Sequence, residues 1–324
     1  MVDGPKVGEN DPNAPAPGRV PEDAFPVGLA RVQDRTQRLR ALLAQPEIVV
    51  APGCFDCITG RLVDAAGFPA VYVTGSGVSM SALGAPDVGM LSFGEILDRV
   101  RRIADVVSIP VIADADTGYG GPLNVMRTVR EFERAGVSAL QIEDQVWPKK
   151  CGHEPGREIA SADEMVGRIK AAVDARTEGI VIVARTDARS TEGLDAAIER
   201  AQLYGEAGAD VLFVESPESE AELDEVNRRL DKPTFANMVE GGRTPILPTP
   251  KLQELGFSIA IFPNSLTRLI GQTGAALMAE LKETGTTAGM ASQMLDHDGL
   301  WDLFDNKRWR ALEDRYRSTP PATK

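Results

Sequence analysis

A segment near the middle of the chain, residues 143–153, gathers side chains that can do acid–base chemistry. It holds two acids, two lysines, a cysteine and one of only two histidines in the sequence. Lys149, Lys150 and His153 flank Cys151, and neighbouring cations favour the thiolate form of a cysteine. We therefore interpret Cys151 as a residue that transfers protons, rather than as a small buried apolar side chain.

Four acids stand in positions that suit a hard metal ion. Asp114, Asp116 and Glu143 follow apolar runs, and Asp87 lies in a loop with glycine and proline. Proteins hold Mg²⁺ with a few carboxylates, together with water and the oxygens of the substrate. With two histidines and no Cys/His cluster in the sequence, zinc is disfavoured. We expect Mg²⁺ here, with Mn²⁺ as a substitute; the alternative is that these acids pair with arginines or cap helices.

Other polar residues suit the anionic ends of a small substrate. Residues 74–76 offer hydroxyls and backbone N–H groups, and Arg185 offers a guanidinium to a carboxylate or a developing oxyanion. Arg185 can also form a salt bridge with Asp187 or Glu215. We find no nucleophile–base–acid triad and no organic-cofactor motif. This set fits cleavage or formation of a carbon–carbon bond next to a carboxylate, with an enolate-like transition state and a thiol that transfers the carbon-bound proton.

The elements that must position these residues follow from apolar periodicity. Short β-branched runs predict eight strands, at 48–51, 70–74, 110–113, 139–142, 180–184, 210–214, 234–237 and 258–262. Between them, apolar residues recur at spacings of three and four, which predicts helices at 95–107, 123–135, 162–176 and 193–207. Gly67, Gly136, Gly208 and Gly256 suit helix C-termini. Strands that alternate with helices predict a closed (β/α)8 barrel, with a doubly wound open sheet as the alternative.

Polar clusters fall at the carboxyl ends of these strands, which meet at one rim of a barrel. We expect a flexible tail at residues 1–27, a barrel domain at 28–266 and additional helices at 267–324. The additional helices are expected at 267–283, 288–303 and 306–316, which is more helix than one barrel unit needs. The surplus predicts a cap on the barrel or a contact with another subunit.

Composition narrows the partners. The net charge of −13 disfavours nucleic acid and anionic membranes, but a divalent cation would still admit a small anionic substrate. We see no apolar run of membrane-spanning length and no signal peptide, so we expect a cytoplasmic protein. Cys54 and Cys57 form a lone C-x-x-C without a second pair, and we expect both to be structural.

The chain resembles the isocitrate lyase / phosphoenolpyruvate mutase superfamily from about residue 35 to 318. The motifs are Thr74-Gly75-Ser76-Gly77, Gly84-x-Pro86-Asp87, residues 114–120, Glu143-Asp144-Gln145, residues 149–153, residues 184–187 and residues 237–242. The resemblance implies an Mg²⁺ site, bound partly through water, at Asp87, Asp114, Asp116 and Glu143. It implies that the 2-oxo acid carboxylate is bound by Tyr72, Thr74, Gly75 and Ser76. It also implies a (β/α)8 barrel whose last helix is exchanged with a partner, commonly in a homotetramer.

In this family Cys151 resembles the general acid of the lyases, on a loop that closes over the substrate. The other catalytic candidates are Arg185, Tyr72 and His153. The remaining candidates for substrate contact are Lys149, Gly152, Glu215, Asn237 and Ser265. A protein that only binds would be indicated by a missing metal ligand or acid, and here all are present.

The cysteine loop favours the lyase branch, because mutases and phosphonopyruvate hydrolases of the family generally lack it. Residues 147–148 and 237–242 resemble dimethylmalate lyases and petal-death-type proteins more than methylisocitrate lyases. We therefore expect an Mg²⁺-dependent lyase that cleaves a 2-hydroxy di- or tricarboxylate to a 2-oxo acid and a carboxylate. The alternatives are a carboxyphosphonoenolpyruvate-type phosphonomutase and an oxaloacetate acetylhydrolase. The sequence departs from the family at Asn264, where relatives usually have Leu.

Overall fold

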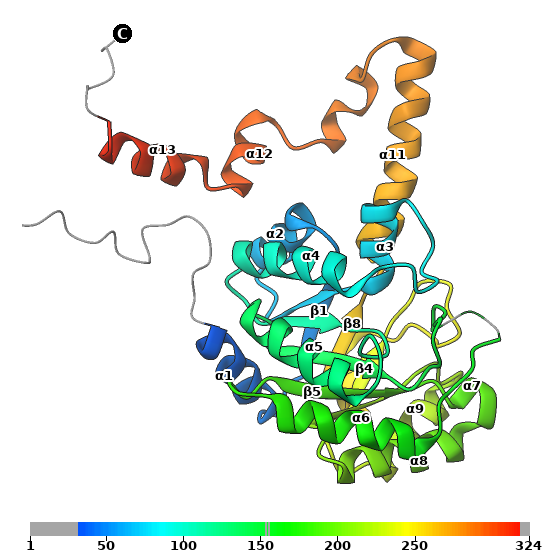
Figure 1. Cartoon of the computed structure of the whole chain (residues 1–324). Coiled ribbons are helices and arrows are strands. Elements are labelled where there is room, and N and C mark those ends of the chain that lie inside the picture. The colour runs from blue at the N-terminus through cyan, green and yellow to red at the C-terminus, as the bar shows by residue number, and fades with distance from the viewer. Residues whose placement is uncertain (1–31, 153, 155, 318–324) are drawn as a thin grey trace, which may run out of the picture.

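Eight parallel strands form the centre of the described chain in a computed structural model, which describes residues 32–317 apart from 153 and 155 (Figure 1). The strands are β1 Val49–Cys54, β2 Val71–Val73, β3 Val111–Asp114, β4 Ala139–Glu143, β5 Val181–Thr186, β6 Val211–Val214, β7 Phe235–Asn237 and β8 Ile259–Phe262. Their order is β6-β5-β4-β3-β2-β1-β8-β7, and a parallel bridge between Leu212 and Thr234 joins the two ends. The predicted barrel and its eight strands are confirmed.

Helices follow the strands and surround the sheet (Figure 1). The helices before the last strand are α1 Val32–Leu43, α2 Cys57–Ala65, α3 Gly75–Leu83, α4 Phe93–Val106, α5 Pro122–Arg134, α6 Ala162–Ala175, α7 Arg189–Glu192, α8 Leu194–Glu206, α9 Glu220–Arg229 and α10 Thr249–Glu254. The helices predicted from periodicity correspond to α4, α5, α6 and α8. Gly67, Gly136, Gly208 and Gly256 have φ values of 78°, 93°, 109° and 96°, a left-handed conformation that suits glycine at helix ends.

Apolar side chains of the strands divide between two cores. Along β5, Val181 and Val183 pack inside the barrel, whereas Ile182 and Ala184 pack against the outer helices. This alternation is expected because successive side chains of a strand point to opposite faces. Leu39 of α1 packs with the inner core, and Arg40 Nε donates to the Gly179 carbonyl at 2.7 Å, before β5 begins. The helix α1 therefore covers the amino-terminal end of the barrel and leaves the other rim for the site.

After β8 the chain leaves the barrel as a C-terminal arm, residues 265–317 (Figure 1). It consists of α11 Ser265–Thr284, η2 Ala288–Gln293, α12 His297–Leu303 and α13 Asn306–Arg315. We predicted one helix over 288–303, which is wrong, because the chain forms two separate pieces there. Asp296 starts the second piece by accepting a hydrogen bond from Gly299 N at 2.7 Å, a helix cap that interrupts a continuous helix.

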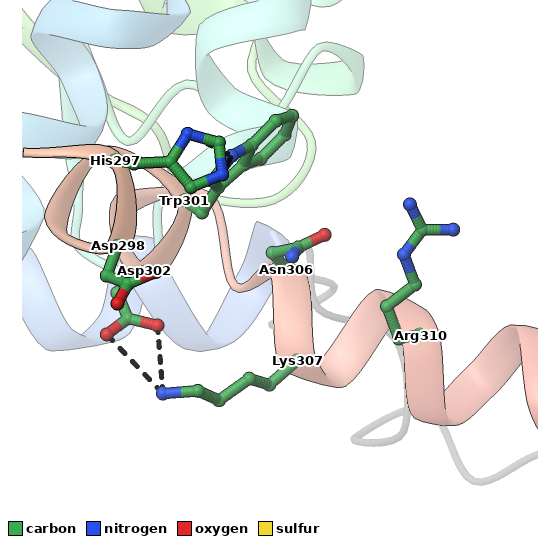
Figure 2. A pocket seen from close by; sticks show the side chains of 7 residues that line it. All are labelled: His297, Asp298, Trp301, Asp302, Asn306, Lys307 and Arg310. Carbon is green, nitrogen blue, oxygen red and sulfur yellow. Dashed lines mark hydrogen bonds and ion pairs between the residues drawn. The ribbon is translucent and has the colours of Figure 1, made fainter. Parts of the chain in front are cut away.

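None of the arm's helices has a buried residue. The arm touches the barrel's outer layer where Arg61 of α2 donates to the Leu303 carbonyl at 3.3 Å and pairs with Asp305 at 2.8 Å. Figure 2 shows a hollow on α12 and α13, where Lys307 pairs with Asp302 and Trp301 packs beside His297. Within the described residues, no helix is long and apolar enough to cross a membrane.

Candidate active site

A cavity of about 40 Å³ lies at the carboxyl ends of the strands. It is lined by Tyr72, Thr74, Ser76, Asp87, Asp114, Glu143, Lys149, Lys150, Cys151, Gly152, Arg185, Glu215, Asn237, Val239, Ile261, Pro263 and Asn264. Most of the residues that we singled out from the sequence therefore meet at one rim, as a barrel requires. Gly75, Asp116 and Ser265 are not among the lining residues, and the Ser265 hydroxyl donates instead to Glu240 Oε1. His153 lies outside the described residues.

The carboxylate cluster, Asp87, Asp114, Asp116 and Glu143, contains an internal cation. Lys149 Nζ lies 2.6 Å from Asp87 Oδ1 and 2.6 Å from Asp116 Oδ1, and the lysine is only 3% exposed. Burial by itself lowers the pKa of Lys149, but the carboxylates around it outweigh burial and raise that pKa well above its usual value. The lysine is therefore charged and balances part of the negative charge of the cluster.

The acids of the cluster are only partly compensated by that lysine. Burial raises the pKa of Asp116 to about 6, with Lys149 opposing the rise and Asp114 adding to it. Burial also raises the pKa of Glu143 well above its usual value, although Arg185 and Lys149 oppose that shift. Glu143 Oε1 is buried and has no hydrogen-bond partner within the described chain. A buried carboxylate oxygen without a donor is a fitting ligand for a cation.

In the described residues, no group of three or more Asp, Glu, His or Cys side chains is gathered closely enough to hold a metal ion. Lys149 Nζ sits between two of the acids, at the place where their charges converge. Mg²⁺ keeps several of its waters in proteins and needs only one or two direct carboxylates. The unpartnered Glu143 oxygen and the oxygen-only donor set therefore fit a hydrated magnesium ion, once the ammonium is displaced.

Arg185 is the second charged centre of the site. Its guanidinium forms two hydrogen bonds of 2.9 Å with the carboxylate of Asp187 and lies 3.2 Å from Glu215 Oε2. It also lies 3.5 Å from Glu143 Oε2 and stacks over the Phe213 ring at 5.2 Å. Both salt bridges considered from the sequence are present. The bidentate geometry holds the guanidinium in one orientation toward the cavity.

A buried network behind Arg185 was not apparent from the sequence. Arg157 Nη1 lies 2.5 Å from Asp187 Oδ1, and although burial acts to raise the pKa of Asp187, the two arginines hold it below the usual value. Asp144 accepts hydrogen bonds from the Asp187 backbone at 2.9 Å and from the Tyr204 hydroxyl at 2.8 Å. These partners of Asp144 lie 43 and 60 positions away in the sequence, so no local pattern could have revealed the contacts.

The loop that carries Cys151 is held close to Arg185. Lys150 and Gln145 exchange two hydrogen bonds of 2.9 Å, and the Ser216 hydroxyl donates to the Gly152 carbonyl at 3.1 Å. A Cβ atom added at Gly152 would lie 2.1 Å from Arg185 Nη2. Only glycine permits this approach of backbone to guanidinium. The loop thus places Cys151 on the wall of the cavity, beside the cationic centre.

The opposite wall is the amino-terminal end of α3. Thr74 is the N-cap residue of this helix, and its side chain accepts a hydrogen bond from Gly77 N at 3.4 Å. A Cβ at Gly75 would lie 2.9 Å from Asp114 Oδ2, so glycine allows the helix to begin beside the acids. The first N–H groups of a helix attract anions. Burial raises the pKa of Tyr72, whose hydroxyl stays protonated and donates to Gln141 Oε1 at 3.1 Å.

These features define a (β/α)8-barrel enzyme whose rim holds acids, a guanidinium and a thiol around one small cavity. The phosphoenolpyruvate phosphomutase family model matches residues 39–282. The 2,3-dimethylmalate lyase of Eubacterium barkeri is 49% identical over 280 residues, which cover 86% of this chain and 97% of that protein. The 2-methylisocitrate lyase of Aeropyrum pernix is 44% identical over 266 residues, covering 82% and 86% of the two chains.

A solved structure of phosphonopyruvate hydrolase in complex with oxalate and Mg²⁺ superposes with a TM-score of 0.79 at 29% identity, covering 87% of this chain and 99% of that one. The chain belongs to the phosphoenolpyruvate mutase/isocitrate lyase superfamily, as its motifs predicted. Within this superfamily it is an oxo-acid lyase that acts on a carbon–carbon bond.

Proposed function

We propose that the protein is an Mg²⁺-dependent lyase that cleaves a substituted malate, or a related 2-hydroxy tricarboxylate, to a 2-oxo acid and a carboxylate. The observation that carries this proposal is that one cavity is lined by Cys151, Arg185 and three acids of the carboxylate cluster. The identity of 49% to a 2,3-dimethylmalate lyase over nearly the whole of that protein supports the substituted-malate class. The 2-methylisocitrate lyase at 44% identity supports the tricarboxylate as a second substrate class.

The polar walls divide the work of the reaction. The α3 amino terminus, with Thr74 and Ser76, binds the carboxylate next to the hydroxyl-bearing carbon. Arg185 binds the second carboxylate, on which negative charge develops as the carbon–carbon bond breaks. A base of the site takes the proton of the hydroxyl group, which becomes the carbonyl of the 2-oxo acid. The bond's electron pair passes to the departing carbon as an enolate, and Cys151 donates a proton to that carbon.

Asp87, Asp114, Asp116 and Glu143 would hold the magnesium ion, partly through water. When bound, such an ion supplies positive charge to the oxygens of the 2-hydroxy acid. The related phosphonopyruvate hydrolase is described in complex with oxalate and Mg²⁺, which supports this cofactor for the superfamily. Lys149 would then give up its place between Asp87 and Asp116 and become available for substrate contact.

The cavity also bears on how substrate enters. Its volume of about 40 Å³ is far below the ~300 Å³ and more of typical ligand sites. Residues 149–152 form one side of it, so a malate derivative enters only when this loop has moved outward. We propose that the loop opens for substrate and product and closes for the chemical step, which keeps water from the enolate.

We further propose that the protein is a homo-oligomer, a tetramer, assembled through the C-terminal arm. The arm carries apolar side chains such as Leu269, Met278 and Trp301, and all of its helices lack buried residues. Apolar helical faces of this extent are stable in water only when another surface covers them. The cover would be the same arm of a partner, placed against its barrel.

A substrate screen tests the proposed function. Purified protein is incubated with 2,3-dimethylmalate, 2-methylisocitrate, isocitrate, oxaloacetate and a phosphonate, with Mg²⁺ present and after chelation. We expect release of a 2-oxo acid from a substituted malate or methylisocitrate, and only with the metal. Release of oxalate from oxaloacetate alone would instead identify an acetylhydrolase. Reaction of the phosphonate alone would identify a phosphonomutase.

A further inference from the structure

Asn264 follows β8 and Pro263, and it is the N-cap residue of α11. Asparagine is favoured at this position because its side-chain oxygen accepts a hydrogen bond from the first turn of the helix. Here the side chain makes no such bond. Its Oδ1 atom is buried and has no hydrogen-bond partner in the part of the chain that the structure describes. Helix capping by the side chain, the usual reason for asparagine at an N-cap, therefore does not explain Asn264.

Asn264 is also one of the residues that line the cavity. Among the other lining residues, Val239, Ile261 and Pro263 have no polar side-chain atoms. Asn237 is a second amide of the lining, and its Oδ1 likewise has no partner among the described residues, but its Nδ2 is held by Glu215 Oε2 at 3.0 Å. An amide oxygen left unpaired inside a protein costs free energy, and buried polar atoms are usually paired by protein, water or ligand.

We infer that Asn264 Oδ1 accepts a hydrogen bond from a hydroxyl group on the substrate, so that the substrate is a malate with a hydroxyl-bearing substituent rather than a plain alkyl group. This inference rests on the proposed function and narrows its substrate class. An acceptor calls for a donor, which excludes a third carboxylate as the partner of this oxygen. A neutral hydroxyl on a short carbon substituent supplies such a donor.

A matched pair of substrates tests the inference. 3-Methylmalate and 3-(hydroxymethyl)malate differ by one hydroxyl, and their kcat/KM values are compared for the unmodified protein and for Asn264→Leu. We expect the unmodified protein to prefer the hydroxymethyl compound by about 10-fold or more, because a site built to bond a hydroxyl leaves its acceptor unpaired with the analogue. Asn264→Leu should lose this preference while still cleaving the methyl compound.

Thr267→Val is the matched control. Thr267 lies in the first turn of α11 and also has a buried oxygen without a partner among the described residues, but it does not line the cavity. Its replacement should leave the ratio of the two kcat/KM values unchanged. An equal change in both variants would assign the effect to the helix and overturn the inference.

Binding measurements separate this inference from the proposed function. If the unmodified protein cleaves neither these compounds nor any 2-hydroxy acid of the substrate screen, the proposed function fails, and calorimetry with the same two compounds still tests Asn264. Tighter binding of the hydroxymethyl compound, lost in Asn264→Leu, would support the role of the amide. Equal or better binding and turnover of the methyl compound by the unmodified protein would refute it.

Discussion

The barrel rim and the C-terminal arm differ in which side chains they bury and which they expose to water. At the rim even charged groups are buried and paired within the chain, as Lys149 and Arg185 illustrate. In the arm even large apolar side chains stay in water, with Leu269 58% and Met278 57% exposed. Burying a charged group costs free energy, so buried charges are typically kept where the chemistry needs them. Exposing a large apolar surface also costs free energy, so such surfaces are typically kept where a partner covers them. The contrast assigns chemistry to the rim and assembly to the arm.

Removal of divalent metal is expected to have the largest effect and tests the rim. Exhaustive chelation should abolish turnover, and Mg²⁺ should restore it, because the carboxylate cluster needs a cation to hold the substrate's oxygens. The rate is measured as release of the 2-oxo acid. Lys149→Met should bind Mn²⁺ more tightly in calorimetry, since it removes the ammonium that occupies the cluster. Full turnover after chelation would refute the metal assignment.

Replacement of the Cys151 thiol should cause the second-largest loss of turnover. Cys151→Ala should lower turnover by roughly 10²–10⁴-fold, the usual contribution of a positioned proton donor. Serine should restore little, because its hydroxyl is a far weaker acid. Substrate affinity should persist in calorimetry, since the α3 terminus and the metal hold the other end.

Cleavage in heavy water provides a second readout for Cys151. The unmodified protein should place one deuterium on the carboxylate product, and Cys151→Ala should lose this transfer. Near-normal cleavage by the alanine variant would exclude Cys151 as the acid, and the reaction would then have to be sought among the mutases.

A methyl group at Gly152 tests how closely the loop must approach Arg185. Gly152→Ala should lower kcat/KM by about 10²-fold, because a displacement near 1 Å at a reacting group has effects of this order. The new Cβ would otherwise stand 2.1 Å from Arg185 Nη2.

Gly94→Ala is the control, since a Cβ there meets nothing within 4 Å in the exposed first turn of α4. It should leave activity intact and raise the melting temperature slightly, because alanine favours helix over glycine. Equal activity in the two variants would show that catalysis does not need the close approach of the Gly152 backbone to Arg185.

Changes in the C-terminal arm should alter the assembly state, and a single substitution there should change the turnover rate less than the substitutions at the rim. A chain ending at residue 266 should be insoluble or dissociated, because the arm's apolar faces and their partner surfaces lose their cover. Light scattering measures the assembly state. Because Met278 is exposed in the single chain, Met278→Glu should change the free energy of unfolding of a monomer by no more than about 0.5 kcal/mol. Dissociation by this single change would place Met278 in the interface, whereas a soluble and active monomer of the shortened chain would refute the proposal.

Much of the barrel could be predicted from local patterns. The run 180–184 is apolar at every position, which indicates a strand covered on both faces, and β5 was found there. Gly208 indicated a helix end because only glycine takes a φ of 109° without strain. Asp114, Asp116, Glu143 and Arg185 were assigned to one rim because each stands at the end of a predicted strand, and parallel strands end together in a barrel. The break at Asp296 was missed, because apolar spacing does not show whether an aspartate continues a helix or starts one as its N-cap, where the backbone is extended.

Sequence by itself determined the strands, most of the helices, the family and the set of chemical groups, because these depend on residue type and on spacings within a few turns of chain. Tertiary structure decided which groups touch. It placed Lys149 between Asp87 and Asp116, brought Arg157 to Asp187, and left the oxygen of Asn264 without a partner. These contacts join residues tens of positions apart, and their geometry depends on the closure of the barrel and on the loops that cross its rim.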